Sequence, residues 1–371
     1  MNKLKVMTVF GTRPEASKMA PVIQVLRGCP SIDTQVTVTA QHREQLDQVL
    51  RIFKITPDYD LNVMRARQTL ADITTAALNG LDTVLREAAP DLVLVHGDTT
   101  TTLAASLAAY YNQIPLGHVE AGLRTYDKYQ PFPEEINRRL TGVLADLHFA
   151  PTTLSKENLI KENIPAQTIY VTGNTAIDCL RTTLSPNHRF TEERLNHLDF
   201  TRRVITMTAH RRENLGRPLT EICRAVKRLA EEHEDVEVVY AVHLNPAVRE
   251  TVVPILGGLP RVLLTEPLDI MDMHNLMNRS YMVLTDSGGL QEEVPSMGKP
   301  VVVLRNVTER PEAVEAGTVV LAGAEEESVY AAVRELLYNE AKYRQMARAV
   351  NPFGDGRASE KILAAILERW K

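Results

Sequence analysis

The chain has 371 residues, of which 44% are hydrophobic and 24% are charged, and its formal net charge is −5. This length exceeds what one ordinary hydrophobic core supports, so we expect two domains. The composition argues against a disordered chain, and the slight acidic excess argues against a nucleic-acid partner, because such binders gather Lys and Arg to release counterions from phosphates.

The cysteines and the N-terminus indicate in which cellular compartment the protein is expected. Cys29, Cys179 and Cys223 are far apart and form no Cys-x-x-Cys pair. This pattern fits neither a disulfide framework nor a structural zinc site, and it favours a reducing compartment. The first apolar run stops at Gly11, too short for a signal peptide, and no stretch reaches the length of a membrane span. We therefore expect a cytoplasmic protein that binds no membrane.

Short apolar runs alternate with longer helix-like stretches along the chain. The strands expected in the first half are residues 5–10, 34–39, 92–96, 115–119 and 147–150. The strands expected in the second half are residues 169–171, 204–208, 236–242, 262–265, 282–285, 301–304 and 319–321. Amphipathic patterns predict helices that include residues 70–87, 218–232 and 329–338. Such alternation predicts parallel sheets with right-handed crossovers.

The expected fold class is α/β, with two doubly wound, Rossmann-like domains and a cleft between them. Residues 182–196 are polar and lack a clear strand pattern, which suggests a boundary nearby, and Gly173 and Asn174 are candidates for the hinge. The predicted domain ranges are 1–170, 171–354 and a C-terminal helix within 355–371 that packs back on the first domain.

Polar clusters follow six of the expected strands, at the carboxyl ends where open α/β sheets bind ligands. The clusters begin at Gly11, His96, Glu120, His210, His243 and Asp286. Because they lie in both halves of the chain, they predict one cleft that is lined from both domains.

Residues 286–293 form the clearest phosphate site in the sequence. Gly288 and Gly289 allow backbone amides to approach an anion, and the helix that follows directs its positive end toward the same place. Glu293 is placed to accept hydrogen bonds from ribose hydroxyls. The alternative is a plain tight turn, which a Gly-Gly pair alone also fits.

Basic side chains near the expected strand ends suit a diphosphate. Arg13 and Lys18 begin the first helix and can supply cations, although each also fits a solvated surface charge. His210 and His243 end strands in the second half, where they face either a phosphate or the core. The two readings stay open for these histidines.

Carboxylates supply candidates for acid–base chemistry. Asp98 and Glu134 lie at expected helix starts, so a capping role competes with catalysis, whereas a structural role is less obvious for Glu120. A P-loop motif and a metal-ligand spacing are both missing from the sequence. A partial dinucleotide fingerprint at 354–359 follows a helical stretch rather than a strand. We expect no metal and no cofactor, NAD included.

The ordered motifs of the chain resemble those of the non-hydrolysing UDP-N-acetylglucosamine 2-epimerases. The motifs are FGTRPE (10–15), VHGDTTTT (95–102), GHVEAGLRT (117–125), PEE (133–135), AHRRE (209–213), VHLNP (242–246), DSGGLQEE (286–293) and TERPE (308–312). They span essentially the whole chain. The resemblance implies a glycosyltransferase-B-like fold and reversible C2 epimerisation of UDP-N-acetylglucosamine to UDP-N-acetylmannosamine, an isomerase reaction that feeds cell-surface polysaccharide synthesis.

The resemblance also implies a mechanism and a set of residues. UDP would be eliminated to give 2-acetamidoglucal and then added back, with protonation from the other face. The implied catalytic residues are Asp98, Glu120, Glu134 and His210. The implied substrate-binding residues are Arg13, Lys18, His243, Ser287, Gly288, Gly289, Glu293 and Arg310. Some relatives bind a second UDP-N-acetylglucosamine as an allosteric activator, and the matching residues are Gln41, His42, Arg67, Glu134 and Arg211. A homodimer is expected from the family.

Three alternative functions stay open on the sequence. A glycosyltransferase-B-type sugar transferase would use the same UDP-sugar but need an acceptor. A hydrolysing 2-epimerase would release UDP and free N-acetylmannosamine. A non-catalytic sensor would bind the nucleotide sugar without turnover, which Asp98, Glu120 and Glu134 argue against.

Overall fold

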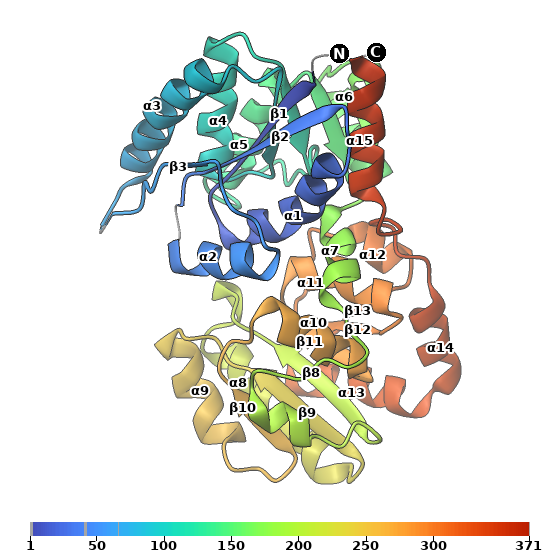
Figure 1. Ribbon diagram of the computed structural model, residues 1–371. Helices are drawn as coiled ribbons and strands as arrows, with labels where there is room; N and C mark the ends of the chain where they lie inside the picture. The colour runs from blue at the N-terminus through green and yellow to red at the C-terminus, as the bar shows by residue number, and fades with distance from the viewer. Residues whose placement is uncertain (1–2, 41–42, 66, 371) are drawn as a thin grey trace. The chain divides into compact units, whose positions relative to one another are not determined.

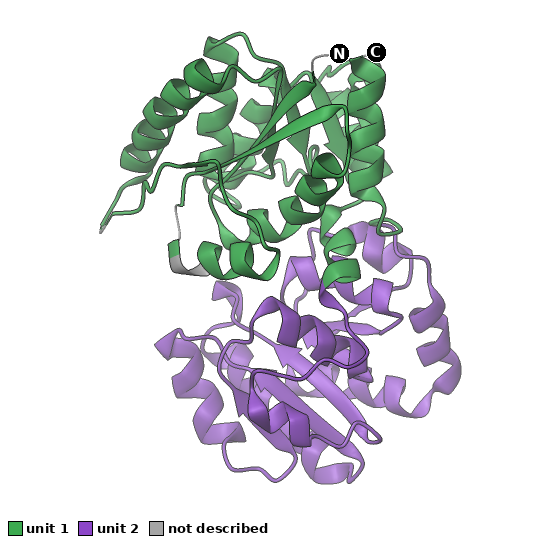
Figure 2. Ribbon diagram, in the orientation of Figure 1, with its two compact units in different colours: residues 1–182, 353–371 green, residues 183–352 purple. Residues whose placement is uncertain are grey.

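The structure is a computed structural model that describes residues 3–40, 43–65 and 67–370. The chain forms two compact units, residues 1–182 with 353–371 and residues 183–352 (Figure 2). The division follows residue 182 rather than residue 170, and the chain returns to the first unit at Phe353. Each unit contains one parallel sheet with helices between its strands. The expected two-domain α/β fold is therefore confirmed.

The strands described in the first unit run in the order β3-β2-β1-β4-β5-β6-β7 (Figure 1). They are β1 Leu4–Phe10, β2 Ile32–Val38, β3 Tyr59–Asp60, β4 Leu92–His96, β5 Leu116–Val119, β6 Leu147–Ala150 and β7 Ile169–Val171. All neighbouring pairs are parallel. Strand β3 was not expected, because two residues are too few to show an alternating pattern.

Strand β7 corrects the grouping made from the sequence, which placed it with the second half. It pairs with β6, with Val171 opposite Ala150, and so belongs to the first sheet. That grouping was wrong because a three-residue apolar run carries no side-chain signal of its partner. Consecutive strands are usually neighbours, and β7 extends the sheet edge beside the strand that precedes it.

Helices of the first unit connect these strands. They are α1 Arg13–Arg27, α2 Arg43–Ile52, α3 Leu70–Ala88, α4 Thr100–Tyr111, α5 Glu134–Leu144, α6 Thr153–Lys161, α7 Thr175–Thr183 and α15 Ala358–Arg369, with a 3-10 turn at Ala166–Thr168. The C-terminal helix α15 packs against α1. Among the described residues, no helix combines the length and apolarity that a membrane span requires.

The strands described in the second unit run in the order β10-β9-β8-β11-β12-β13, again all parallel. They are β8 Arg203–Thr208, β9 Val236–Ala241, β10 Val262–Thr265, β11 Met282–Thr285, β12 Val301–Val303 and β13 Val319–Leu321. The helices are α8 Arg217–Glu232, α9 Pro246–Leu256, α10 Ile270–Arg279, α11 Gly288–Glu293, α12 Pro311–Glu315, α13 Glu326–Tyr338 and α14 Glu340–Arg348. Three 3-10 turns lie at Glu193–His197, Arg212–Asn214 and Val294–Met297.

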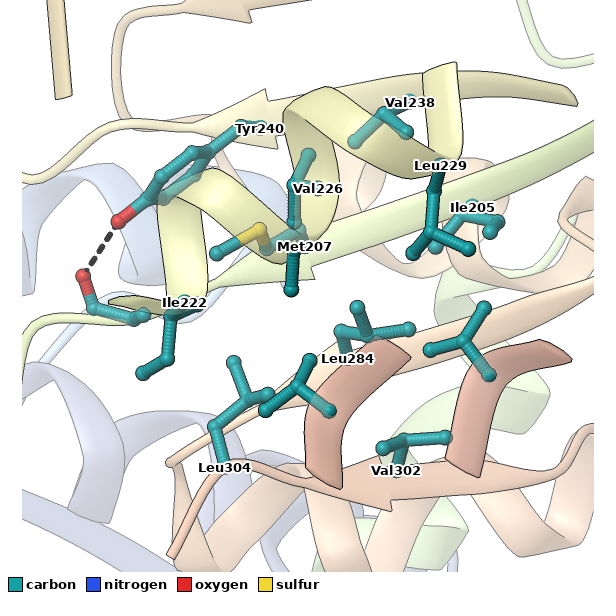
Figure 3. Packing of buried hydrophobic residues seen from close by; sticks show 14 of the residues in the cluster. Ile205, Met207, Ile222, Val226, Leu229, Val238, Tyr240, Leu284, Val302 and Leu304 are labelled. Carbon is teal, nitrogen blue, oxygen red and sulfur yellow. Dashed lines mark hydrogen bonds between the residues drawn. The ribbon is translucent and has the colours of Figure 1, made fainter. Parts of the chain in front are cut away.

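The core of the second unit explains why α8 forms as it does. Ile222, Val226 and Leu229 recur at helical spacing and point onto strands β8 and β9 (Figure 3). Strand residues facing them are apolar and fully buried, which is the pattern that an amphipathic helix on a parallel sheet requires. At the edge of this core the buried Tyr240 hydroxyl donates to the Ala209 carbonyl at 2.7 Å, directly before the polar loop that follows β8.

A buried carboxylate anchors the C-terminal helix. Asp178 on α7 is 5% exposed, and its two oxygens accept hydrogen bonds from the backbone N–H groups of Ala358 at 3.1 Å and Ser359 at 2.7 Å. These are among the first N–H groups of α15, which have no partner within their own helix. Arg357, at the N-cap position, makes no side-chain cap of its own. Asp178 therefore supplies the N-terminal cap from another helix.

Replacing Asp178 by Ala should loosen α15, because two buried N–H groups lose their acceptors, at a cost of about 2–4 kcal/mol. Trp370 follows α15 and is the single tryptophan of the chain, so its fluorescence during urea unfolding reports on this helix. Asp355→Ala is the control, since Asp355 pairs with Lys361 on the surface and should cost less than about 1 kcal/mol. Equal unfolding midpoints for the two variants would contradict the anchoring role.

Candidate active site

The strand order locates a candidate site in each unit. Both sheets change winding direction once, between β1 and β4 in the first unit and between β8 and β11 in the second. Open parallel sheets bind ligands beyond the carboxyl ends of the strands at such a switch point. Gly11 and Asp98 lie there in the first unit, and His210 and Asp286 lie there in the second. Four of the six polar clusters noted in the sequence thus fall at the two switch points, namely those that begin at Gly11, His96, His210 and Asp286.

In the first unit, a buried carboxylate joins the two loops of the switch point. Glu15, which is 2% exposed, accepts hydrogen bonds from the backbone N–H of Gly11 at 3.1 Å and of Thr12 at 2.8 Å. It also accepts one from the Thr99 hydroxyl at 2.7 Å, directly after Asp98. Burial raises the pKa of Glu15, and these hydrogen bonds oppose the rise. Glu15 fixes the loop that leads into Arg13, whose side chain is exposed at the start of α1.

Glu120 is the most closely surrounded of the expected catalytic carboxylates. Its Oε2 accepts hydrogen bonds from Lys18 Nζ and from Asn174 Nδ2, the latter at 2.8 Å, and His96 Nε2 lies 3.7 Å away. Burial lowers the pKa of His96 to about 4, so this ring is neutral near pH 7. Glu120 itself has a φ of +63°, a conformation that costs a non-glycine residue about 1–2 kcal/mol. The surrounding contacts hold the carboxylate in place despite that cost.

Lys18 was expected to supply a cation to a diphosphate, and in the structure its ammonium pairs with Glu120. The side chains of Lys18 and Glu120 are 15% and 9% exposed, so the ion pair is largely shielded from water. Lys18 therefore belongs with the carboxylates of the first unit.

Asp98 lies at the end of β4, beside the end of β5 that carries Glu120. Arg138 holds Asp98 Oδ2 through Nη2 at 2.5 Å and Nε at 3.1 Å, and the same guanidinium reaches Glu135 at 3.1 Å. Helix α5 begins at Glu134, one turn before Arg138. Glu134 Oε2 is buried and has no hydrogen-bond partner among the described residues. The three expected carboxylates are therefore carried by the β4 and β5 ends and by α5, all in one unit.

In the second unit the two expected histidines lie together. The rings of His210 and His243 stack with their centroids 5.1 Å apart and their planes 13° apart. His243 Nδ1 accepts a hydrogen bond from the Asn245 backbone N–H at 3.1 Å. His210 Nδ1 lies 3.8 Å from Oδ1 of the fully buried Asp286. Both residues are exposed, as a phosphate-facing role requires.

Gly288 is overlain by two guanidinium groups. A side-chain carbon at this position would lie 3.6 Å from Arg211 Nη2 and 3.7 Å from Arg310 Cζ. Arg310 is held by a hydrogen bond to the fully buried Glu292, and Arg211 lies 3.3 Å from Glu309. Ser287 and Gly289 flank Gly288 at the start of α11. Two cations over bare backbone form an arrangement that suits a diphosphate.

Glu293 ends helix α11 and is partly exposed. Its Oε2 lies 3.3 Å from Nε2 of the buried His274, whose Nδ1 shares a 2.7 Å hydrogen bond with the Thr183 hydroxyl. The carboxylate therefore has a fixed orientation beside the Gly288 turn. This placement suits the ribose contact that the sequence suggests.

The structure describes only some of the expected allosteric residues. Gln41 and His42 lie outside the described residues. Arg67 is exposed in the first unit, in a surface pocket that it shares with Arg65 and Asp72. Arg211 lies in the second unit beside Gly288. No group of three His, Cys, Asp or Glu side chains within residues 3–40, 43–65 and 67–370 is arranged to hold a metal ion.

The buried ring of His118 contacts the loop that follows β4, and protonation of this ring should destabilise the fold at low pH. It is fully buried, its Nε2 lies 2.7 Å from the Gly97 carbonyl, and burial lowers its pKa to about 3. In the unfolded chain a histidine takes up a proton near pH 6.5. The stability that comes from the neutral ring is therefore fully present above about pH 6.5 and is lost as the pH falls toward about 3.

Between about pH 6 and pH 4, this residue alone should lower the free energy of unfolding by about 1.4 kcal/mol per pH unit. Urea unfolding of the wild type and of His118→Asn over this range measures the difference between the two slopes. Parallel slopes would show that His118 binds a proton equally well in the folded and unfolded states.

Comparison with known proteins decides the family. The family model described as UDP-N-acetylglucosamine 2-epimerase matches residues 24–367. The UDP-N-acetylglucosamine 2-epimerase of Bacillus subtilis is 57% identical over 367 residues, which cover 99% of this chain and 96% of that protein. The chain belongs to the UDP-N-acetylglucosamine 2-epimerase family. It is therefore an isomerase of the non-hydrolysing type, as the resemblance implies.

Solved structures of relatives agree with this assignment. The Staphylococcus aureus MnaA structure with UDP is 51% identical and covers 99% of this chain and 97% of its own, with a TM-score of 0.91. The Neisseria meningitidis UDP-GlcNAc 2-epimerase bound to UDP-GlcNAc is 49% identical and covers 98% and 100%, also with a TM-score of 0.91. The glycosyltransferase-B-like architecture expected for the epimerase family is thereby confirmed.

Several side chains that contact the expected site residues were not themselves predicted as site residues from the sequence. Arg138 contacts Asp98, His96 lies beside Glu120, and Asn174 binds Glu120 although it was noted only as a hinge candidate. One signal was available for Arg138, because it lies four residues after Glu134 on one helix face. Asn174 is 54 residues from Glu120 along the chain, and no local pattern connects the two.

Proposed function

We propose that this protein interconverts UDP-N-acetylglucosamine and UDP-N-acetylmannosamine by inversion at C2 of the sugar. The observation that carries the proposal is the convergence of Arg211 and Arg310 on Gly288, which suits a diphosphate. Family membership supports the sugar nucleotide, since a related structure contains UDP-GlcNAc. The carboxylates Asp98 and Glu120 of the first unit supply acid–base groups for the sugar.

We infer that the reaction proceeds through elimination and re-addition of UDP. The C2 proton passes to a carboxylate, the C1–O bond breaks with its electron pair going to UDP, and a C1=C2 double bond forms. In the second step a proton is delivered to the other face of C2 while the diphosphate oxygen bonds to C1 again. Direct removal of the proton without elimination is disfavoured, because no carbonyl lies next to C2 to accept the charge.

Charge accumulates on the diphosphate as the C1–O bond breaks, so groups that donate hydrogen bonds to it lower the barrier. We assign this role to His210, with Arg310 and the Gly288 backbone holding the nucleotide and Glu293 the ribose. Asp98, Glu120 and Glu134 form the acid–base set, and one of them takes the C2 proton. Arg13 remains a candidate for a phosphate contact from the first unit.

The test is to incubate the purified protein with UDP-N-acetylglucosamine alone in D₂O and to follow the reaction by NMR. We expect UDP-N-acetylmannosamine to appear, with deuterium at C2 of both epimers. Free N-acetylmannosamine and UDP as the accumulating products would indicate a hydrolysing enzyme. A sugar transferred only after an acceptor is added would indicate a glycosyltransferase. Binding without any turnover would indicate a sensor and would contradict the proposal.

We further propose that the protein works in the cytoplasm as a homodimer and supplies cell-surface polysaccharide synthesis, and that a second UDP-N-acetylglucosamine activates it. The activator proposal rests on Gln41, His42, Arg67, Glu134 and Arg211. Initial rates of the reverse reaction test it, because UDP-N-acetylmannosamine alone should turn over slowly until a little UDP-N-acetylglucosamine is added. Sedimentation measures the oligomeric state.

A further inference from the structure

One fully buried carboxylate ties together the two loops at the switch point of the second unit. Asp286 follows β11, and its Oδ2 accepts three hydrogen bonds from the loop that follows β8. The donors are the backbone N–H groups of His210 and Arg211, both at 2.8 Å, and Asn214 Nδ2 at 3.0 Å. The same residue begins the turn that leads into Gly288. A single side chain therefore sets the spacing between the histidine loop and the proposed diphosphate turn.

The second oxygen of Asp286 has a different environment. Oδ1 is buried and has no hydrogen-bond partner among the described residues, and it lies 3.8 Å from His210 Nδ1. A buried carboxylate oxygen without a donor is costly, and a positively charged neighbour offsets that cost. His210 is the ring that lies next to this oxygen.

The ring stacked on His210 uses its Nδ1 atom as a hydrogen-bond acceptor. His243 Nδ1 accepts the Asn245 backbone N–H, so its proton must be on Nε2. Two stacked rings 5.1 Å apart would repel each other if both were charged. His210 is the ring of this pair that has an acidic neighbour, Asp286. The same loop also carries Arg211, Arg212 and Glu213. The Arg211 guanidinium is directed to Glu309 and Gly288, and Glu213 pairs with Arg305.

We propose that Asp286 is a positioning residue for the epimerisation: it orients the His210 ring and balances its positive charge, so that His210 Nε2–H can donate to the departing diphosphate while His243 stacks on the His210 ring. The inference rests on the proposed function, in which His210 faces the diphosphate. It assigns Asp286 a role that acts only through His210. In other enzymes an acidic residue orients a catalytic histidine in the same way.

Asp286→Asn separates this role from a structural one. The amide oxygen can still accept the three N–H groups at the Oδ2 position, whereas the NH₂ group removes the negative charge beside His210. We expect kcat to fall roughly 10- to 100-fold, less than the 10²–10³-fold typical for loss of a whole transition-state donor. UDP affinity, measured by calorimetry, should stay within about threefold, because Arg310 and the Gly288 backbone are retained.

A double-mutant cycle with His210→Gln provides the decisive measurement. If Asp286 acts through His210, adding Asp286→Asn to His210→Gln should lower kcat by less than about twofold. Equal effects of Asp286→Asn in both backgrounds would overturn the proposal, and so would a kcat for Asp286→Asn within about twofold of the wild type. If Asp286→Asn does not fold, Asp286→Ser replaces it in the cycle, since its hydroxyl can accept an N–H group and carries no charge.

Asp272→Asn is the matched control. Asp272 is 1% exposed in the same unit and its Oδ1 lies 2.7 Å from His188 Nε2, so the change removes a similar buried charge beside a histidine outside the proposed site. Its kcat should stay near the wild-type value, and a loss equal to that of Asp286→Asn would overturn the proposal. A wild type without epimerase activity would instead contradict the proposed function, which keeps the two failures distinct.

Discussion

Replacing Glu120 by Gln is expected to lower kcat by about 10³-fold, within the range that a positioned acid or base contributes. The amide keeps the shape of the side chain and can still accept from Asn174 at 2.8 Å, but it cannot take up or deliver a proton at pH 7. Lys18 also loses its negative partner. UDP should bind with nearly unchanged affinity, because Glu120 is not among the proposed nucleotide contacts.

Steady-state kinetics and calorimetric UDP binding test this expectation together, and Asp98→Asn should behave in the same way. Glu162→Gln is the control, because Glu162 also pairs with a cationic side chain of the first unit, Arg124 at 2.6 Å, away from the proposed carboxylates. Its kcat should stay within about twofold of the wild type. A Glu120→Gln enzyme that retains a tenth or more of the wild-type kcat would remove Glu120 from the acid–base set.

Gly122→Ala is expected to prevent stable folding of the first unit. Gly122 follows Glu120 by two residues, has a φ of +91°, and a side-chain carbon there would lie 2.2 Å from the Ser155 carbonyl oxygen. That oxygen belongs to helix α6, so the clash can be relieved only if the backbone of this packed helix moves. The clash and the positive φ together should cost about 3–5 kcal/mol, a large part of the stability of a domain.

The thermal midpoint and the soluble yield measure this effect. Gly258→Ala is the matched control: Gly258 has a φ of +79°, but a side-chain carbon there meets nothing within 4 Å. The Gly258→Ala variant should lose only the stability that a positive φ costs a residue with a side chain, about 1–2 kcal/mol. If the two variants melt at the same temperature, the close approach to Ser155 does not limit the fold.

Local patterns were enough for most of the secondary structure and for the loops that carry the candidate site residues. Apolar runs such as residues 92–96 coincide with β4, since buried parallel strands need continuous apolar side chains. The motif around Gly288 predicted a turn that an anion can approach, because glycine leaves the backbone bare. These predictions depend on residues that are close together in the chain. Their physical causes, the burial of an apolar strand and the missing side chain of glycine, act over the same short range.

Contacts between distant residues could not be derived in this way. The sequence suggested only that Lys18 can supply a cation, and its contact with Glu120, which is 102 residues away, had no local signal. Strand β7 was grouped with the wrong sheet, because backbone pairing does not depend on the side chains of so short a run.

The sequence by itself determined the family, the alternation of strands and helices, and the loops in which the proposed site residues lie, because motif order and hydrophobic period are local properties. The tertiary structure decided which of those side chains act as partners. Asp286 and His210 are 76 residues apart, and their pairing exists only because β8 and β11 become neighbours when the sheet forms. Strand pairing is a cooperative property of the whole unit, which no single segment encodes.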